Sequence, residues 1–354
     1  MKRTCQRRVI WVVLLAVAVG AAGWHGPGHE LASRTAVAML PKEMPAFFLA
    51  GGEAIAHSAR DPDLFTRPIA PRELHAQEAS EHYFDLELLA GEEVPATRYE
   101  FIELCARKGI SPPKVGLLPY AIVEWTQRLT VAFAEHRKWP GNPHVRHKCL
   151  LYAGICSHYA QDLCMPLHTT IHWDGRANAD GTSPRTGIHA RADALLQKLP
   201  VSPAEAADGL QAEAFDDLMA AVMANFRASH ALVDRLYELE ARLPKLEDPL
   251  PGDSEASAFA RERLRAAAAF TASLHLTAWR NSAKIELPEW HQRSDKEIIP
   301  DEAASRPAQP PAGDSQSGES SWRFWGSVVA AAVAGFAGAL VLCRCRRGKP
   351  AGPR

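Results

Sequence analysis

The sequence predicts an all-α fold built from many helices. Apolar residues recur at helical spacing over several long stretches, and the clearest of these runs from Val115 to Trp139. No segment shows the alternation of apolar and polar residues that is typical of a strand, and neither an Asn-Gly hairpin nor an internal repeat is present. The apolar sides of these helices are expected to form the hydrophobic core.

The chain begins with a segment that resembles a signal peptide over residues 1–23. An apolar run over residues 9–19 follows four basic residues, and Ala21-Ala22-Gly23 provides the small residues of a cleavage site. Cleavage after Gly23 would make Trp24 the first residue of the mature chain. An uncleaved membrane anchor is the alternative.

Further helices are expected in order along the chain. His29 opens a helical pattern that continues to Leu40 and stops at Pro41. Ser202 and Glu205 have the spacing of a capping box at the start of another helix. Helical patterns also cover residues 98–108, 115–139, 215–243 and 254–283, and residues 173–186 have the composition of a loop.

The stretch from His158 to His168 contains three potential metal ligands, His158, Asp162 and His168. His158 and Asp162 are four residues apart, so they lie on one face of a helix. The apolar residues 150–156 indicate that this helix is buried, and Pro166 is expected to end it, with His168 on the turn beyond. A buried imidazole and carboxylate need compensation for lost hydration. A bound cation would supply it, and a histidine paired with an aspartate in a metal-free core is the alternative.

A second unit repeats this spacing about thirty residues later, where His189 precedes Asp193 by four positions. Two such units suggest several metal ions. Zinc is the expected metal, because imidazole and carboxylate both suit it, whereas magnesium and calcium prefer oxygen ligands alone. The loop between the two units is expected to form the rim of the site.

Taken together, these residues resemble the zinc-dependent phospholipase C and S1/P1 nuclease superfamily. The matching positions are, in order, Trp24, His29, Asp61, His82, His158, Asp162, His168, His189 and Asp193. The match extends from Trp24 to about Pro200. It implies a multi-helix domain over residues 24–290 that holds three zinc ions. At the position of Asp61, Asp63 is an alternative ligand.

The resemblance also implies how the ligands are shared. Asp61, His82, His158 and Asp162 would hold one ion, and His168, His189 and Asp193 the second. The amino and carbonyl groups of Trp24, with His29 and the far oxygen of Asp162, would hold the third. The implied activity is phosphodiester hydrolysis, because zinc activates water near neutral pH and offsets the negative charge of a phosphodiester. Asp61 would also orient the attacking water.

Three functions are compatible with this site, and the first is favoured. Gly187-Ile188-His189 is closer to the phospholipase form, which favours release of phospholipid headgroups. The short spacing from Trp24 to His29 and the aspartate at Asp193 favour the alternative, a single-strand nuclease. A metal-stabilised surface domain that binds without turnover is an alternative of another class.

Charge argues against a general nucleic-acid-binding surface. The whole chain has a net charge of −1. Residues 1–23 contain four basic residues and residues 344–354 contain five, with no acidic residue in either segment, so the residues between them carry a net charge of −10. Three zinc ions would offset only part of this charge. Any nucleic acid would therefore be attracted by the metals rather than by the surface.

The C-terminal part of the sequence indicates a membrane tether. Residues 291–321 are rich in proline, serine and acidic residues, which predicts a disordered linker. Residues 322–343 are mostly apolar with Trp322 and Trp325 at one end, and the basic tail 344–354 follows, which predicts a transmembrane helix with a cytoplasmic tail. The catalytic domain is then expected outside the cytoplasm, and no protein partner is inferred.

Four cysteines fall in the predicted catalytic domain, at Cys105, Cys149, Cys156 and Cys164. Cys149 and Cys156 are seven residues apart on one helix, about 10 Å along its axis, which is too far for a disulfide. Either Cys105 takes part in a bridge or all four are buried thiols.

Overall fold

A computed structural model describes residues 26–295, which fold into helices with no strand among them. Two isolated β-bridges, Phe84–Gly116 and Trp173–Gly175, are the only extended pairings that they form. The all-α prediction is therefore confirmed.

The α-helices are α2 (Gly26–Ala38), α3 (Ala46–Ala50), α4 (Gly52–Ser58), α5 (Asp61–Phe65), α6 (Arg72–Glu78), α7 (Arg98–Lys108), α8 (Pro112–Val115), α9 (Leu118–Lys138), α10 (Pro143–Leu163), α11 (Ile188–Asp193), α12 (Pro203–Ala207), α13 (Leu218–His230), α14 (Val233–Glu238) and α15 (Glu255–Ser282). Short 3₁₀ helices are η1 (Ala79–His82), η2 (Leu86–Leu89), η3 (Pro166–Thr169), η4 (Leu196–Lys198) and η5 (Glu240–Arg242).

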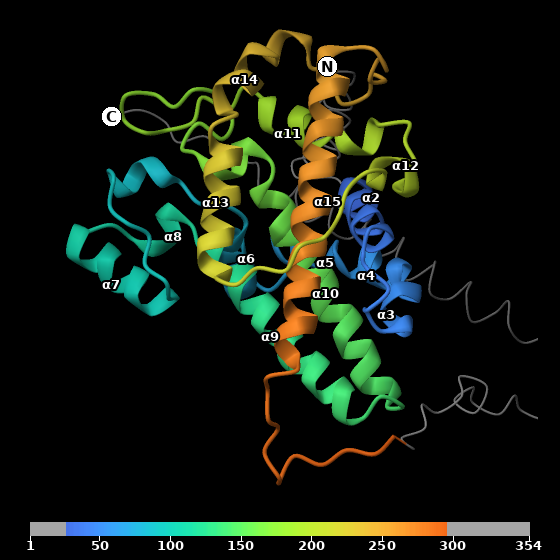
Figure 1. The fold of residues 1–354 in the computed structure, drawn as a ribbon. Helices are drawn as coiled ribbons and strands as arrows, with labels where there is room; N and C mark the ends of the chain where they lie inside the picture. The colour runs from blue at the N-terminus through green and yellow to red at the C-terminus, as the bar shows by residue number, and fades with distance from the viewer. Residues whose placement is uncertain (1–25, 296–354) are drawn as a thin grey trace, which may run out of the picture. The chain divides into compact units, whose positions relative to one another are not determined.

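The long helices α9, α10 and α15 pack against one another at the centre of the fold (Figure 1). The N-terminal helix α2 packs against α15 and α4, and α4 packs against α10. Leucine, phenylalanine and alanine side chains of these helices fill two hydrophobic clusters, which together form the core. The buried area of such a core supplies most of the favourable free energy of folding. The functional side chains described below are carried on this frame.

The second half of α10 is buried on every side, from Ala153 to Leu163. Gly154 lets α4 approach closely, because a Cβ at this position would lie 2.5 Å from the Cβ of Ser58 and 2.6 Å from the carbonyl oxygen of Ile55. The end of α4 is thereby held against α10, one turn before His158. The small residue thus brings the segment after α4, which leads into α5, to the functional part of α10.

Several predicted boundaries agree closely with the structure. The pattern over 98–108 is α7, which starts with a capping box formed by Thr97 and Glu100. The predicted capping box of Ser202 and Glu205 is present at the start of α12. The helix that carries His158 ends at Leu163, before Pro166, and His168 lies in η3. The stretches 115–139 and 215–243 are each divided, the first at Gly116 and the second at Ala231 and Leu232.

All four cysteines between residues 26 and 295 are buried and free. Of the two possibilities that the sequence left open, the structure has the four buried thiols. Burial raises the pKa of Cys149, Cys156 and Cys164 to about 12, so these side chains behave as small apolar groups.

Several predicted segments lie outside the described residues. These are the signal peptide 1–23, Trp24, the transmembrane helix 322–343, the basic tail 344–354 and most of the linker 291–321. Within residues 26–295, no helix is both long and apolar enough to cross a membrane. Residues just after Trp290 contact the α9–α10 connection, since Asp295 Oδ1 accepts a hydrogen bond of 2.8 Å from the backbone of Gly141. We therefore place the start of any linker after Asp295.

Candidate metal centre

The structure brings the predicted ligands together in three groups. The first contains His29, His158 and Asp162, the second Asp63, His82 and His158, and the third His168, His189 and Asp193. In each group the ligand atoms lie within 4.8 Å of one another. Because His158 belongs to two groups, the first and second groups are adjacent. The third group contains the three ligands that the family resemblance implies for the second ion. The other two groups differ from the implied sets, because both contain His158 and Asp63 stands in place of Asp61.

Six elements supply these side chains, and most of them are distant from one another in the sequence. α10 provides His158 and Asp162 from its buried end, and η3 provides His168 just beyond the helix. Asp63 lies on α5, which follows α4, and His82 is the last residue of η1. His29 comes from α2, and α11 carries both His189 and Asp193. The cluster thus depends on the packing of most of the fold.

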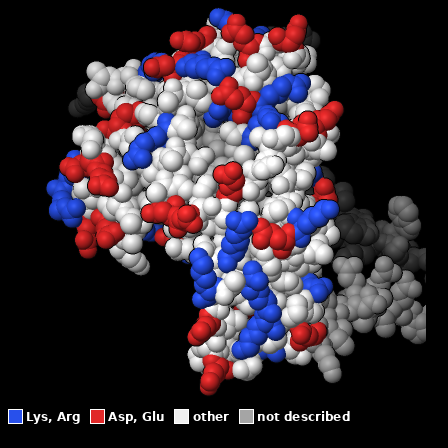
Figure 2. Space-filling view, in the orientation of Figure 1, with Lys and Arg blue, Asp and Glu red and all other residues white. Residues whose placement is uncertain are grey.

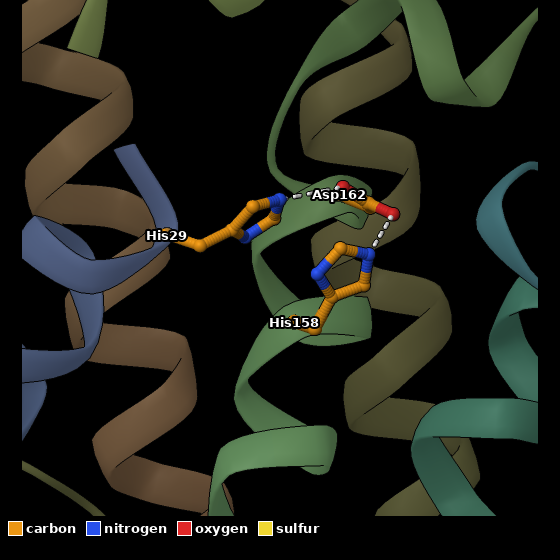
Figure 3. Close-up of side chains that lie close together, drawn as sticks. All are labelled: His29, His158 and Asp162. Carbon is orange, nitrogen blue, oxygen red and sulfur yellow. Dashed lines mark ion pairs between the residues drawn. The ribbon is translucent and has the colours of Figure 1, made fainter. Parts of the chain in front are cut away.

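Asp162 joins the first two groups because its two oxygens face different histidines (Figure 3). Oδ1 lies 3.6 Å from Nε2 of His29. Oδ2 lies 3.3 Å from Nε2 of His158 and 2.9 Å from Nδ1 of His82. The carboxylate is 1% exposed, and within the described residues Oδ1 accepts no hydrogen bond. A carboxylate in this position is suited to bridging two cations.

The third group is centred on Asp193, which is fully buried. Its carboxylate oxygens lie 3.0 Å from Nε2 of His189 and 3.6 Å from Nε2 of His168. Neither oxygen accepts a hydrogen bond of normal geometry from any residue between 26 and 295. Leaving such atoms unsatisfied costs roughly 1–3 kcal/mol each, so the arrangement needs a further partner. An ion between the two imidazoles and the carboxylate would satisfy all of them.

Four of the five histidines are held by the nitrogen that faces away from the ligand groups. In each, Nδ1 is hydrogen-bonded to an oxygen and Nε2 is directed at a carboxylate of the cluster. The pairs are His29 with Gln161 Oε1 at 2.7 Å, His158 with the carbonyl of Ala59 at 2.8 Å, His168 with the carbonyl of His82 at 2.7 Å, and His189 with the carbonyl of Trp173 at 3.1 Å. Metal-binding histidines are oriented in this way, with the outer N–H fixed by an acceptor. Because an oxygen of this kind accepts a hydrogen bond, Nδ1 of each of these histidines carries the proton and Nε2 carries the lone pair.

The electrostatics of the cluster also suit a cation. Burial disfavours the imidazolium form of His82, but Asp162 and Glu78 outweigh this effect and raise its pKa to about 10. The same competition between burial and the carboxylates Asp162 and Asp193 raises the pKa of His168 to about 9. Without a metal, protons on these imidazoles balance the buried carboxylates. A metal ion would replace those protons, so binding would release them to solvent.

A cavity of about 400 Å³ opens beside the second and third groups. His82, His168 and His189 form part of its wall. Its other lining residues are Tyr83, Asp85, Lys114, Leu167 and Trp173, and Trp173 lies in the predicted rim loop. Burial, with a smaller contribution from Glu87, raises the pKa of Asp85 to about 7. The cavity therefore combines aromatic side chains, an ammonium group and a carboxyl group at the candidate metal centre.

Two features of this centre differ from the sequence analysis or were missed by it. Asp61 belongs to none of the three groups, and Asp63, the alternative, takes its place beside His82 and His158. Asp61 is the first residue of α5, and Asp63 lies two residues further along the short helix. Glu78 and Gln161 contact ligand histidines and were not predicted. The spacing of four between Glu78 and His82 is the one signal that was available for Glu78.

Comparison with known proteins adds no assignment. No protein-family model matches the chain, and the search of curated proteins finds no significant match. The family resemblance therefore rests on the residues and their arrangement.

Proposed function

We propose that the chain is a zinc-dependent phosphodiester hydrolase with a three-ion centre, related to the phospholipase C and S1/P1 nuclease superfamily. The observation that carries this proposal is the set of three ligand groups, two of which are linked through His158 and the two oxygens of Asp162. A buried histidine paired with an aspartate accounts for one group. It does not account for three adjacent groups with buried, unsatisfied carboxylate oxygens.

The donor set fits zinc. Asp63, His82, His158 and Asp162 would hold one ion, and His168, His189 and Asp193 a second. His29 and Asp162, together with Trp24, would hold the third. Five imidazoles among eight side-chain ligands favour zinc over magnesium or calcium. When bound, zinc supplies Lewis acidity, which makes water a competent nucleophile near neutral pH and offsets charge on the phosphoryl oxygens.

The residues of the chain have separate tasks in this scheme. The carboxylate of Asp63 would orient the attacking water, which is the role first expected for Asp61. Lys114 faces the cavity and would attract an anionic phosphodiester. Tyr83, Leu167 and Trp173 would cover the substrate and exclude bulk water, which strengthens every charge interaction in the cavity.

A phospholipid is the favoured substrate class. The segment between Asp63 and Glu78, whose two ends lie at the centre, exposes large apolar side chains: Leu64 is 54% exposed and Ile69 86% exposed. Trp173, at the cavity, is 37% exposed. Apolar groups beside a site suit a substrate with acyl chains, because they make contact with the lipid surface from which the headgroup is taken.

A single-strand nuclease is the second candidate, favoured by the two aromatic side chains that line the cavity. Tyr83 and Trp173 offer surfaces on which a base can stack, and Asp85 can hydrogen-bond to a base edge. The net negative charge of the chain between its two basic ends gives this candidate less support. On the face seen in Figure 2, acidic and basic side chains are interspersed over the upper part, and basic ones gather in the lower part, over α9, α10 and α15.

The test compares both substrates with the full chain purified from an exporting host. We expect release of phosphocholine from phosphatidylcholine, its loss on treatment with a chelator and its return with zinc. Asp162→Asn should reduce the rate to background, and Glu73→Gln, on the exposed side of α6, should not change it. Cleavage of single-stranded DNA alone would favour the nuclease. Bound zinc with neither activity would contradict the proposal and favour the binding domain.

The choice between the two aspartates gives a sharper prediction. Asp63→Asn should lower the rate by at least about 100-fold, because even the outer partners of metal ligands contribute about 10–100-fold. Asp61→Asn should lower it less than about threefold, since Asp61 lies in none of the ligand groups. Steady-state rates of the two variants at saturating zinc provide the measurement. A larger loss of rate in Asp61→Asn than in Asp63→Asn would make Asp61, rather than Asp63, the residue that orients the water.

The mature chain is expected to begin at Trp24. A free amino group and the carbonyl of the same residue can close a five-membered chelate ring, which the third ion needs in addition to His29 and Asp162. N-terminal sequencing of exported protein measures this directly. A variant with one added residue before Trp24 should bind one zinc fewer, and unchanged zinc content would remove Trp24 from the site.

A further inference from the structure

His82 is the exception among the five histidines of the centre. Its Nδ1, rather than its Nε2, faces the other ligands, at 2.9 Å from Oδ2 of Asp162 and 3.0 Å from Nε2 of His158. The other four histidines have Nδ1 fixed by an oxygen acceptor and Nε2 directed at Asp162 or Asp193. For His82 the roles of the two nitrogens are exchanged, so an acceptor for its N–H must be sought at Nε2.

Glu78 occupies that position. Its Oε1 lies 3.5 Å from Nε2 of His82, which has no hydrogen-bond partner of normal geometry within residues 26–295. The same oxygen accepts a short hydrogen bond from the hydroxyl of Tyr159. The side chains of His82 and Glu78 are only 11% and 12% exposed, so water competes little for these contacts. Glu78 therefore contacts both Tyr159 and His82 and connects the two side chains.

The backbone supports these contacts. Glu78 is the last residue of α6, which continues directly into η1, and His82 follows one turn later. Tyr159 is the neighbour of His158 on α10, and its ring packs edge-on against the rings of both His82 and His158. The buried helix thus fixes the tyrosine, the tyrosine fixes the carboxylate, and the carboxylate is placed to fix the imidazole.

We infer that Glu78 is a positioning residue for the metal centre, and that Tyr159 holds it in place. A neutral imidazole has one N–H and one lone pair. With the N–H of Nε2 donated to Glu78, the lone pair of Nδ1 is directed at the point where Asp63, His158 and Asp162 converge. The negative carboxylate also makes the imidazole a stronger ligand, as in the carboxylate–histidine–zinc arrangement. This inference rests on the proposed zinc centre.

The test measures zinc affinity of the full chain by competition with a chromophoric chelator. Glu78→Gln keeps the shape of the side chain and removes its charge, and Tyr159→Phe removes the hydroxyl. We expect Glu78→Gln to weaken one of the bound ions by about 10–100-fold, as outer-partner substitutions do. Tyr159→Phe should weaken the same ion by less. Glu73→Gln, on an exposed residue of α6, is the matched control and should leave all affinities unchanged.

Two further readouts separate positioning from a role in stability. At saturating zinc, Glu78→Gln should retain the wild-type zinc content and melting temperature. With cobalt in place of zinc, its visible absorption spectrum should differ from that of the wild type, because one imidazole is reoriented.

Wild-type affinity and spectrum in Glu78→Gln would overturn the inference while leaving the zinc centre intact. Loss of a whole ion at saturating zinc would make Glu78 a ligand, which also overturns it. A wild-type protein that binds no zinc would refute both the centre and the positioning role.

Discussion

Removal of zinc is expected to lower the melting temperature of the protein by at least about 10 °C. A ligand that binds only the folded state stabilises it by about 4 kcal/mol when it is present at a thousand times its dissociation constant. In a domain of this size, 1 kcal/mol corresponds to roughly 2–4 °C. A single tightly bound ion therefore accounts for the expected shift, and three linked ions would increase it.

The physical reason is the burial of charge. Asp162 and Asp193 are almost completely buried beside imidazoles, and Asp63 is partly buried. Without metal, compensation comes from protons on His82 and His168, whose pKa values are raised by the neighbouring carboxylates. Ions would pair with all of these groups at once. Metal binding is thus linked to folding free energy.

Thermal unfolding followed by circular dichroism, with and without chelator, measures this effect. His158→Ala should lower the melting temperature even in excess zinc, because His158 belongs to two groups and is completely buried. His147→Ala is the matched control, on an exposed position of the same helix. Identical melting curves with and without chelator would mean that the apolar core alone determines stability.

The sequence predicted the parts of this centre that depend on local spacing. His158 and Asp162 lie one turn apart on α10, and His189 and Asp193 on α11, so helical periodicity alone places each pair on one face. The end of α10 at Leu163 also has a local cause, because Pro166 cannot continue the helix. The order of the remaining ligands came from the family resemblance.

Other features depend on tertiary packing and could not be predicted in this way. Asp61 and Asp63 are equivalent in the sequence, and only the docking of α5 against α10 brings Asp63 to His82. That docking relies on Gly154, whose missing side chain admits the end of α4. Glu78 acquires its role from two contacts, one of them with Tyr159, eighty-one residues away. The stretch 215–243 contains no proline or glycine, so the sequence gives no local signal for its division into α13 and α14.

Asp162→Asn is expected to lose more than one of the three zinc ions. The two oxygens of Asp162 face different groups, Oδ1 towards His29 and Oδ2 towards His158 (Figure 3). Oδ2 also lies near His82. The substitution replaces one oxygen by an amide that carries hydrogens, which cannot bind a cation, and removes the negative charge shared by two sites. Asn has nearly the same shape as Asp, so the packing of the buried end of α10 is preserved.

Elemental analysis of the purified full chain after removal of loosely bound metal gives the zinc content. Asp193→Asn is the matched control, because Asp193 is equally buried and serves only the group with His168 and His189. We expect a loss of about two ions in Asp162→Asn and about one in Asp193→Asn. Equal losses would mean that Asp162 does not bridge, and the first two groups would then act as separate sites. A wild type with a single zinc would reduce the centre to one ion, with the remaining histidines and carboxylates paired with one another.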